Sequence, residues 1–282
     1  DSRIRAIHKE NGGAGSARNR GLEEASGEFL MFPDADDWLE PDMLEALLRR
    51  QEETGADVVI CGYTGNYSYL DLSKAEVTRV DAAFFSTKEE VRSYFVSLFP
   101  DGIVGYLWNK LYRAGPIREN GLRFPDMRRY QDGVFNLYVF TYAGSCALLN
   151  RELYHYKLND VADAFAKFPR DLYELTEQFI QAYEGTLENW GFLTSAAENR
   201  ILTFYGNSVV SCLDSMYSPK WHFTGRERAA YIQGLLEKPR LQQTLARLEH
   251  IEGLSRYARL ALSLLKRKRT LALRGGIRIK LW

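Results

Sequence analysis

Residues 29–41 read Phe-Leu-Met-Phe-Pro-Asp-Ala-Asp-Asp-Trp-Leu-Glu-Pro, and this stretch decides how the first half of the chain is interpreted. Its four leading apolar residues form a short continuous run of the kind that a buried parallel strand shows. Pro33 and the aspartates that follow it end the strand, and Pro41 opens a helix because proline is favoured in the first helical turn. The stretch therefore predicts a strand, an acidic loop and a helix in succession.

The segments on either side of this stretch alternate between strand and helix patterns. Residues 4–8 are predicted as a strand, and a glycine-rich loop at residues 11–15 precedes a helix over about residues 16–25. Residues 56–63 predict the next strand, and a capping box at residues 87–90 predicts a further helix. This alternation predicts an α/β fold built on an open sheet.

Beyond residue 158 the pattern becomes helical. Apolar residues recur at helical spacing from Leu172 to Trp190, and further helices are predicted over about residues 196–216 and 226–251. A chain of 282 residues is long enough for one large domain or two unequal ones. We therefore expect an α/β domain over residues 1–158, a helical domain over residues 159–252 and a basic tail over residues 253–282.

The composition is that of an ordinary globular protein, because 45% of the residues are hydrophobic and 26% are charged. Lys plus Arg and Asp plus Glu both number 37, so no basic excess indicates a nucleic-acid partner. The cysteines, Cys61, Cys146 and Cys212, are odd in number and widely spaced in apolar surroundings, which is typical of reduced thiols in a cytoplasmic protein. No apolar run approaches the ~20 residues that cross a bilayer.

Asp34 and Asp36 lie two positions apart at the end of a predicted buried strand. An extended backbone would project both carboxylates to the same side. Ligands of open α/β sheets bind beyond the carboxyl ends of the strands, and oxygen ligands without neighbouring Cys or His favour Mg²⁺ or Mn²⁺. The two aspartates are therefore a candidate metal site. The alternative is an acidic loop in which one aspartate caps the following helix.

The chain contains five further motifs: Asn11-Gly12-Gly13, Ala17-Arg18-Asn19-Arg20-Gly21, Trp108-Asn109-Lys110-Leu111-Tyr112-Arg113, Gly121-Leu122-Arg123-Phe124-Pro125 and Tyr130-Gln131-Asp132-Gly133-Val134-Phe135-Asn136. In type and spacing, these motifs and residues 26–41 resemble the family 2 inverting glycosyltransferases that use nucleotide-diphospho-sugars. The downstream segments look like the acceptor side of bacterial members that build cell-surface polysaccharides. The resemblance covers about residues 1–158 and implies the open-sheet fold of nucleotide-diphospho-sugar transferases.

The resemblance implies a reaction in which an acceptor hydroxyl attacks the anomeric carbon of the donor sugar, with inversion, while a nucleotide diphosphate leaves. A divalent ion held by Asp36, with Asp34 on the ribose or the metal, would neutralise the leaving group. Asp132 is the candidate base, at a place where the family has a Glu-Asp pair and this chain has Gln131-Asp132. Removing the neighbouring charge is expected to lower the pKa of Asp132 slightly. The alternative is that Asp132 only caps the helix over residues 134–140.

The same resemblance implies contacts on both sides of the reaction. The expected donor-binding residues are Asn11, Gly12, Gly13, Arg18, Asn19 and Asp34. The expected residues for a glycan or lipid-linked acceptor are Trp38, Trp108, Asn109, Lys110 and Gln131. The tryptophans are expected either to stack on sugar rings or to belong to the core. His155 could approach the metal, or it could be an ordinary strand histidine.

The chain also departs from the family pattern. It lacks the two strands with which family members begin, including an Asp-Asp-Gly-Ser type turn that reads the nucleotide base. We therefore expect the native protein to be longer and this chain alone to be inactive. Two other functions stay open at this stage: a non-catalytic sugar-binding or nucleotide-binding module, and a glycoside hydrolase that uses Asp34 and Asp132.

Residues 253–282 contain no acidic residue and carry nine basic ones: Arg256, Arg259, Lys266, Arg267, Lys268, Arg269, Arg274, Arg278 and Lys280. In residues 254–265 the apolar positions share one helix face. A basic amphipathic helix predicts attachment to the anionic inner face of a membrane. The alternatives are a solvated helix end and a phosphate contact with nucleic acid.

Overall fold

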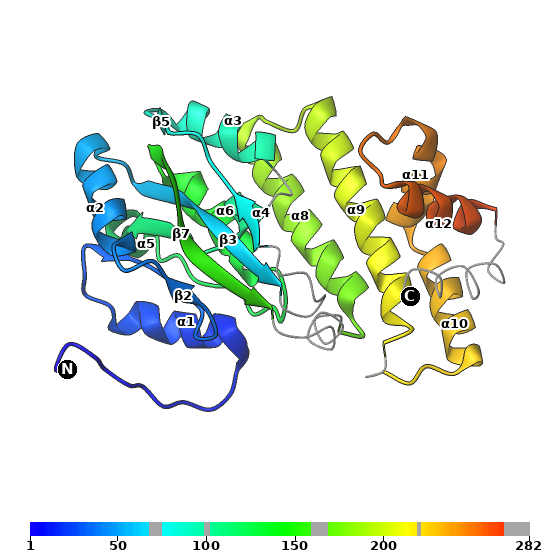
Figure 1. Ribbon diagram of the computed structural model, residues 1–282. Helices are drawn as coiled ribbons and strands as arrows, with labels where there is room; N and C mark the ends of the chain where they lie inside the picture. Colours follow the sequence, from blue (N-terminus) through cyan, green and yellow to red (C-terminus); the bar gives the residue numbers. More distant parts are fainter. Residues whose placement is uncertain (68–74, 99–101, 159–168, 219–220, 268–282) are drawn as a thin grey trace. The chain divides into compact units, whose positions relative to one another are not determined.

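The computed structural model describes residues 1–67, 75–98, 102–158, 169–218 and 221–267 (Figure 1). The chain divides into two compact units. The first consists of Asp1–Gly65 and Glu76–Lys157, and the second of Asn66–Ala75 and Leu158–Trp282. Each unit is described by itself below.

The first unit contains a seven-stranded sheet (Figure 1). Its strands are β1 (Phe29–Leu30), β2 (Trp38–Leu39), β3 (Val58–Tyr67), β4 (Ala75–Thr78), β5 (Ala83–Phe85), β6 (Lys110–Arg113) and β7 (Cys146–Leu158). The strand order is β1-β6-β3-β7-β2, with β4 paired to β3 and β5 paired to β7. The predicted apolar strand exists as β1, but it pairs antiparallel with β6 and lies at one end of the order.

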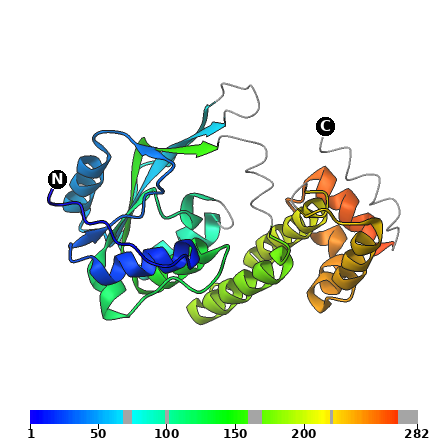
Figure 2. The ribbon, with the colours of Figure 1, turned by 90° about the horizontal axis from the view of Figure 1, so that it is seen from below.

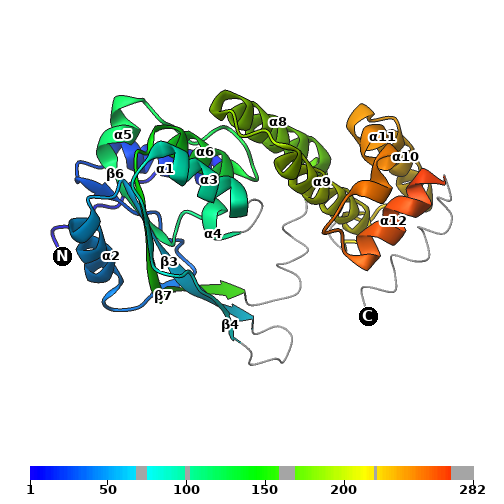
Figure 3. The same cartoon turned by 90° about the horizontal axis from the view of Figure 1, so that it is seen from above.

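Helices cover both faces of this sheet: α1 (Gly13–Glu24), α2 (Met43–Thr54), α3 (Lys88–Leu98), α4 (Gly102–Gly105), α5 (Ala114–Glu119) and α6 (Gln131–Tyr142). Helix α2 lies on one face, and α3, α5 and α6 lie on the other (Figure 3). Met43 and Leu47 of α2 pack against Val59 and Cys61 of β3, which share one face of the strand because side chains alternate. All three cysteines are free and buried.

Residues 4–8 do not form the predicted strand. The backbone over residues 4–12 has no regular secondary structure, and Ile4 and Ile7 are 75% and 41% exposed. A strand forms only where a neighbour satisfies its backbone groups, and no described strand pairs with this segment. The helix predicted from residue 16 begins earlier, at Gly13.

The second unit is helical over most of its described residues from Leu172 onward (Figures 1 and 2). It contains α8 (Leu172–Trp190), α9 (Ser195–Ser215), α10 (Gly225–Leu236), α11 (Pro239–Ala246), the short 3₁₀ helix η2 (Leu248–His250) and α12 (Arg256–Lys266). The helical segment predicted over about residues 226–251 is divided into α10, α11 and η2. It is interrupted before Pro239, which cannot continue a helix but is suited to begin one.

The amphipathic pattern predicted for residues 254–265 is confirmed in α12. The apolar face of this helix is buried and is therefore not exposed to a membrane surface. Ala258, Ala261, Leu262 and Leu265 are buried, and α12 packs against α9, α11 and η2. The apolar face therefore belongs to the core of the helical unit. Lys268, Arg269, Arg274, Arg278 and Lys280 lie outside the described residues. Among the described helices, none is long and apolar enough to cross a membrane.

Candidate functional site

The acidic loop after β1 is anchored to β7 through Asp37. The Tyr154 hydroxyl donates to Asp37 Oδ2 at 2.7 Å and accepts from the Asp34 backbone N–H at 3.1 Å. The Lys157 backbone N–H donates to Asp37 Oδ1 at 2.8 Å. Burial raises the pKa of Asp37, while these hydrogen bonds act in the opposite direction. Asp37 therefore holds the loop in place, a role that the sequence analysis missed although a third acidic residue directly follows the Asp-x-Asp pair.

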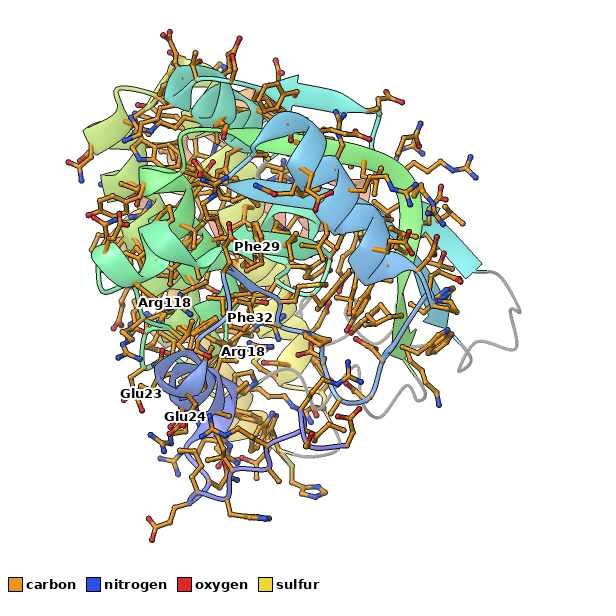
Figure 4. The ribbon with its side chains drawn as sticks, turned by 90° about the vertical axis from the view of Figure 1, so that its left-hand side faces the viewer. Arg18, Glu23, Glu24, Phe29, Phe32 and Arg118 are labelled. Atoms are coloured by element: carbon orange, nitrogen blue, oxygen red, sulfur yellow. The ribbon has the colours of Figure 1, made fainter. Side chains whose placement is uncertain are left out.

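Arg18 brings α1 to this loop. Its Nη2 lies 2.7 Å from Asp34 Oδ1, and the two side chains are 17% and 36% exposed. The guanidinium carbon lies 5.7 Å from the centre of the Phe124 ring. Figure 4 shows Arg18 on the side of α1 that faces Phe32 at the strand end. Arg18 Nη1 is buried without a hydrogen-bond partner among the described residues, so it is available to an anionic or carbonyl group of a ligand.

Asn19, a predicted donor contact, is used to hold α1 in position. Its Nδ2 donates to the Phe124 carbonyl at 2.9 Å, and its Oδ1 accepts from the Phe124 backbone N–H at 2.8 Å. Gly15 brings the helix close to the same loop, since a Cβ there would lie 3.3 Å from the Pro125 carbonyl oxygen. We therefore assign Asn19 to positioning Arg18, because both ends of its amide are occupied.

The predicted donor loop lies at the start of α1 and is exposed. Asn11 Oδ1 accepts from the Gly13 backbone N–H at 3.1 Å, and Gly12 is the N-cap residue without a side-chain cap. The backbone N–H groups of the first helical turn have no intrahelical partners, and the helix dipole is positive there. The three residues are therefore accessible to a ligand.

Asp132 lies in the first turn of α6 and is partly buried. Burial raises its pKa, whereas the hydrogen bond from the Gly133 N–H and the charge of Arg18 lower it and the charge of Asp34 raises it. This rise is relative to a free aspartate, so the expected decrease on replacing the charged neighbour with Gln131 stays a prediction. Arg18, Asp34 and Asp132 are thus close enough to interact electrostatically. The helix begins at Gln131, so Asp132 is inside its first turn rather than at its cap.

The two residues before Asp132, Tyr130 and Gln131, each have one unfavourable feature. Tyr130, the residue before α6, adopts a left-handed conformation with φ of 66°, which is strained for a residue with a large side chain. Gln131 Oε1 is buried and forms no hydrogen bond within the described part of the chain. A buried acceptor without a donor is unfavourable, so a ligand hydroxyl could satisfy it.

The predicted acceptor residues of the segment 108–110 are in the core. Trp108 is 4% exposed and stacks on Tyr106 and Tyr154, with ring centres 4.6 and 4.3 Å apart. Asn109 and Lys110 are both 0% exposed. This burial does not support direct contact of these three residues with an acceptor.

The contacts of Lys110 show a different role for it. Lys110 Nζ donates to the Ile103 carbonyl at 2.7 Å, to Asn109 Oδ1 at 2.8 Å and to the Tyr106 carbonyl. Burial lowers the pKa of Lys110 to about 7. Lys110 therefore ties the segment at the end of α4 to the start of β6.

Trp38 is the predicted acceptor tryptophan that remains accessible, with 45% exposure. Its ring stacks on His155, with centres 4.8 Å apart and planes within 5° of parallel. His155 Nε2 lies 2.6 Å from Glu40 Oε1. His155 is therefore engaged by a carboxylate and an aromatic ring, which corresponds to the strand-histidine interpretation rather than to a metal ligand.

The acidic loop after β1 contains the two carboxylates predicted to hold a divalent ion, those of Asp34 and Asp36. The described residues contain no group of three or more His, Cys, Asp or Glu side chains that could hold a metal. Asp36 is exposed and forms no ion pair with a described residue, whereas Asp34 is paired with Arg18. Mg²⁺ binds through one or two carboxylates together with water and substrate phosphates, so Asp36 fits such an ion and Asp34 fits less well.

This chain is similar in sequence to known glycosyltransferases. EpsH of Bacillus subtilis is 34% identical over 178 residues, which cover 62% of this chain and 50% of EpsH. Glycosyltransferase GlyA of Streptococcus pneumoniae is 31% identical over 165 residues, covering 56% of this chain and 23% of GlyA. This chain therefore spans about half the length of EpsH and less than a quarter of the length of GlyA.

A solved structure of Staphylococcus aureus TarS 1–349 in complex with UDP-GlcNAc aligns with a TM-score of 0.58 at 18% identity. The alignment covers 93% of this chain and 70% of that one, and at this identity it shows a shared fold. The family model described as glycosyl transferase family 2 matches residues 1–156, which contain Arg18, Asp34, Asp36, Trp38 and Asp132. The chain therefore belongs to glycosyltransferase family 2.

Proposed function

We propose that this chain carries the catalytic part of an inverting glycosyltransferase that moves a sugar from a nucleotide-diphospho-sugar to a hydroxyl group of a glycan or lipid-linked acceptor. The observation that supports this most directly is the cluster of Arg18, Asp34 and Asp132 beside the exposed Asp36. It combines a cation, a carboxylate free for a metal ion and a desolvated carboxylate. These are the groups that a diphosphate leaving group and a hydroxyl nucleophile require.

On the donor side, Asn11, Gly12 and Gly13 offer backbone N–H groups to a phosphate at the start of α1. Arg18 lies between α1 and the acidic loop, where its unpaired Nη1 can bind the nucleotide. Asp34, already paired with Arg18, is placed for a ribose hydroxyl. Asp36 would hold Mg²⁺ or Mn²⁺, and such an ion when bound supplies Lewis-acid neutralisation of the diphosphate.

On the acceptor side, Asp132 accepts the proton of the attacking hydroxyl. The hydroxyl oxygen forms a bond to the anomeric carbon from the face opposite the leaving group. The bond between that carbon and the diphosphate oxygen breaks, and its electron pair leaves with the nucleotide diphosphate. Gln131 Oε1, buried without a donor among the described residues, is suited to orient the same hydroxyl.

The test uses the full-length protein and separates binding from turnover. Asp36→Asn is expected to abolish the effect of Mg²⁺ or Mn²⁺ on nucleotide-sugar affinity measured by calorimetry. Asp132→Asn is expected to leave donor affinity unchanged and to lower kcat by roughly 10²–10⁴-fold, because a general base acts in the transition state. Asp126→Asn, an exposed aspartate of the preceding loop, is the control.

Three results would change the assignment. Near-native turnover of Asp132→Asn would move the base to another residue. Metal-dependent donor binding that survives Asp36→Asn would remove the metal from this loop. Donor binding by the wild-type protein without any transfer would favour a non-catalytic binding module.

We also propose that basic residues near the C-terminal end of the chain associate with an anionic membrane surface. The support is the exposure of Arg256, Lys266 and Arg267 on or next to α12. The apolar face of α12 is buried in the helical unit, so the contact with the membrane would be made by these cations. Attraction between these cations and anionic lipid would hold the site near a lipid-linked acceptor.

A further inference from the structure

Trp38 is one of the exposed aromatic residues of the first unit, together with Phe84, Tyr138 and Tyr142. It is 45% exposed, whereas Trp108 of the same unit is 4% exposed. Leaving an indole in water is unfavourable, since burying a large aromatic side chain contributes more than burying most other residues. Its exposure leaves the indole accessible to a ligand.

The indole is held in one orientation by its neighbours. Strand β2 pairs antiparallel with β7, and the register places Trp38 opposite His155. The His155 ring covers one face of the indole at 4.8 Å, and Glu40 fixes His155 through its Nε2. The Glu40 backbone N–H donates to the Leu153 carbonyl at 2.9 Å, which holds the end of β2 to β7. A preorganised ring loses little entropy when it binds a ligand.

The ring also lies beside the part of the loop that the proposed function assigns to the donor diphosphate. One residue, Asp37, separates Asp36 from Trp38, so the Cα atoms of Asp36 and Trp38 are at most about 7 Å apart. Asp37, between them, is fixed to β7 by Tyr154 and Lys157. The backbone that carries the indole is therefore held close to Asp36, where the proposed function puts the diphosphate.

The surrounding chemistry suits a sugar. A sugar ring has an apolar face of C–H bonds, which packs on the electron-rich face of an indole, and an edge of hydroxyl groups, which donate to carboxylates. The Glu40 carboxylate is 41% exposed and lies next to the stacked pair, so it can accept from such a hydroxyl. The indole and the carboxylate thus present an apolar surface and an acceptor together.

We propose that Trp38 and Glu40, with His155 as the positioning residue, form a binding site for one sugar ring beside the donor diphosphate. This inference rests on the proposed function, because it takes the diphosphate to be at Asp36. The sugar is either the one carried by the donor or one belonging to the acceptor glycan. Both present the same ring chemistry to the indole, and the two arms of the experiment distinguish them.

The donor arm measures affinity by calorimetry in Mg²⁺ for UDP, GDP and dTDP, and for UDP-glucose, UDP-N-acetylglucosamine, GDP-mannose and dTDP-glucose. The ratio of affinities for the sugar conjugate and its free diphosphate isolates the sugar. If the donor sugar occupies the site, Trp38→Ala reduces this ratio by about tenfold, and Trp38→Phe restores most of it. Affinity for the free diphosphate is expected to stay unchanged in both variants.

The acceptor arm measures binding of neutral oligosaccharides, such as chitotetraose and maltotetraose, with UDP and Mg²⁺ present. If an acceptor sugar occupies the site, Trp38→Ala weakens oligosaccharide binding by about tenfold while the donor ratio is unchanged. Leu44→Ala, which removes another exposed apolar side chain from the following helix, is the control.

If Trp38→Ala changes binding in neither arm, the proposed sugar site is wrong. If the wild-type protein binds a nucleotide-sugar under these conditions, the proposed function stands although the sugar site fails. Loss of oligosaccharide binding in a protein that binds no nucleotide would support the sugar site and overturn the donor assignment. Near-UV circular dichroism of Trp38→Ala and Trp38→Phe separates loss of the ring from loss of the fold.

Discussion

At the scale of single residues, the site combines carboxylates in three different environments. Asp36 is exposed, Asp37 is held by Tyr154 and the Lys157 backbone, and Asp132 is partly buried near Arg18 and Asp34. Burial penalises the charged form of Asp132 and so raises its pKa, which makes it a stronger base than an exposed aspartate. The same burial makes the ionised side chain unfavourable for stability.

The first prediction concerns Asp132 and stability. Because the folded-state pKa is raised, the folded protein binds this proton more tightly than the unfolded chain, so stability is lost as the pH rises above the unfolded value of about 3.8. Asp132→Asn is therefore expected to increase the free energy of unfolding at neutral pH, and the increase should disappear as the pH falls below that value. Urea unfolding of wild type, Asp132→Asn and Asp126→Asn over this range measures it. A destabilised Asp132→Asn protein would contradict the burial argument.

The second prediction concerns Lys110, whose pKa in the folded protein, about 7, is below the ordinary lysine value of 10.5. Between these values the unfolded chain binds a proton that the folded protein lacks, so stability is expected to rise with pH, by up to about 1.4 kcal/mol per pH unit. The Lys110→Met variant is expected to lack this rise of stability with pH. Lys88 is exposed, so the Lys88→Met variant is expected to keep it. Unfolding curves at pH 7, 8 and 9 compare the slopes. Parallel slopes for all three proteins would show that Lys110 stays protonated in the core.

At the scale of elements, α12 decides how the end of the described chain is used. The helix begins with Ser255, whose hydroxyl accepts from the Ala258 N–H at 3.1 Å, and its apolar residues face α9 and α11. Gly206 of α9 permits this approach, since a Cβ there would lie 3.0 Å from a Leu254 methyl group and 3.1 Å from a Leu262 methyl group. The amphipathic pattern is thus satisfied inside the protein.

The third prediction uses two leucines of α12 that differ in environment. Leu262 is 0% exposed and Leu260 is 60% exposed. Leu262→Ala is expected to destabilise the helical unit by about 2–5 kcal/mol, because it leaves a cavity, whereas Leu260→Ala should change stability by less than about 0.5 kcal/mol. Circular dichroism melting at 222 nm compares them. Equal, small effects would mean that α12 is not part of this core in solution.

At the scale of the whole molecule, charge is balanced overall but not along the chain. The formal net charge is zero, whereas residues 253–282 contain nine basic residues and no acidic one. Deleting this entire region is a poor test of membrane binding, because it would remove α12 from the core of the helical unit. Substitution of charges without shortening the helix avoids that problem.

The fourth prediction is that the full-length protein co-sediments with vesicles of phosphatidylglycerol and phosphatidylcholine, and that binding weakens as salt rises, since the Debye length is only ~8 Å at physiological ionic strength. Replacing Lys266, Arg267, Lys268 and Arg269 with Gln is expected to reduce binding, because each cation near the surface contributes about 1 kcal/mol. Replacing Lys88 and Arg49 is the control. Unchanged or salt-insensitive binding would exclude these residues as the membrane contact.

The sequence by itself determined the class of the fold and most of the local elements. The strands near residues 29–32 and 56–63, the helices after the acidic loop and beyond residue 172, and the amphipathic pattern of α12 all follow from short-range periodicity, which the structure bears out. The motif containing Asp34 and Asp36 could be recognised for the same reason, since spacing along an extended chain is local information.

Only the tertiary structure decided which polar residues remain available. Lys110 and Asn109 look like surface contacts in the sequence but are buried under their own hydrogen bonds, and Asn19 is occupied by the Phe124 backbone. Trp38 and Trp108 are the same residue type, yet one is exposed and the other is enclosed by tyrosines. Residues 4–8 have an alternating pattern but no described partner strand. Burial, hydrogen-bond satisfaction and strand pairing depend on residues distant in sequence, and for that reason local patterns could not determine them.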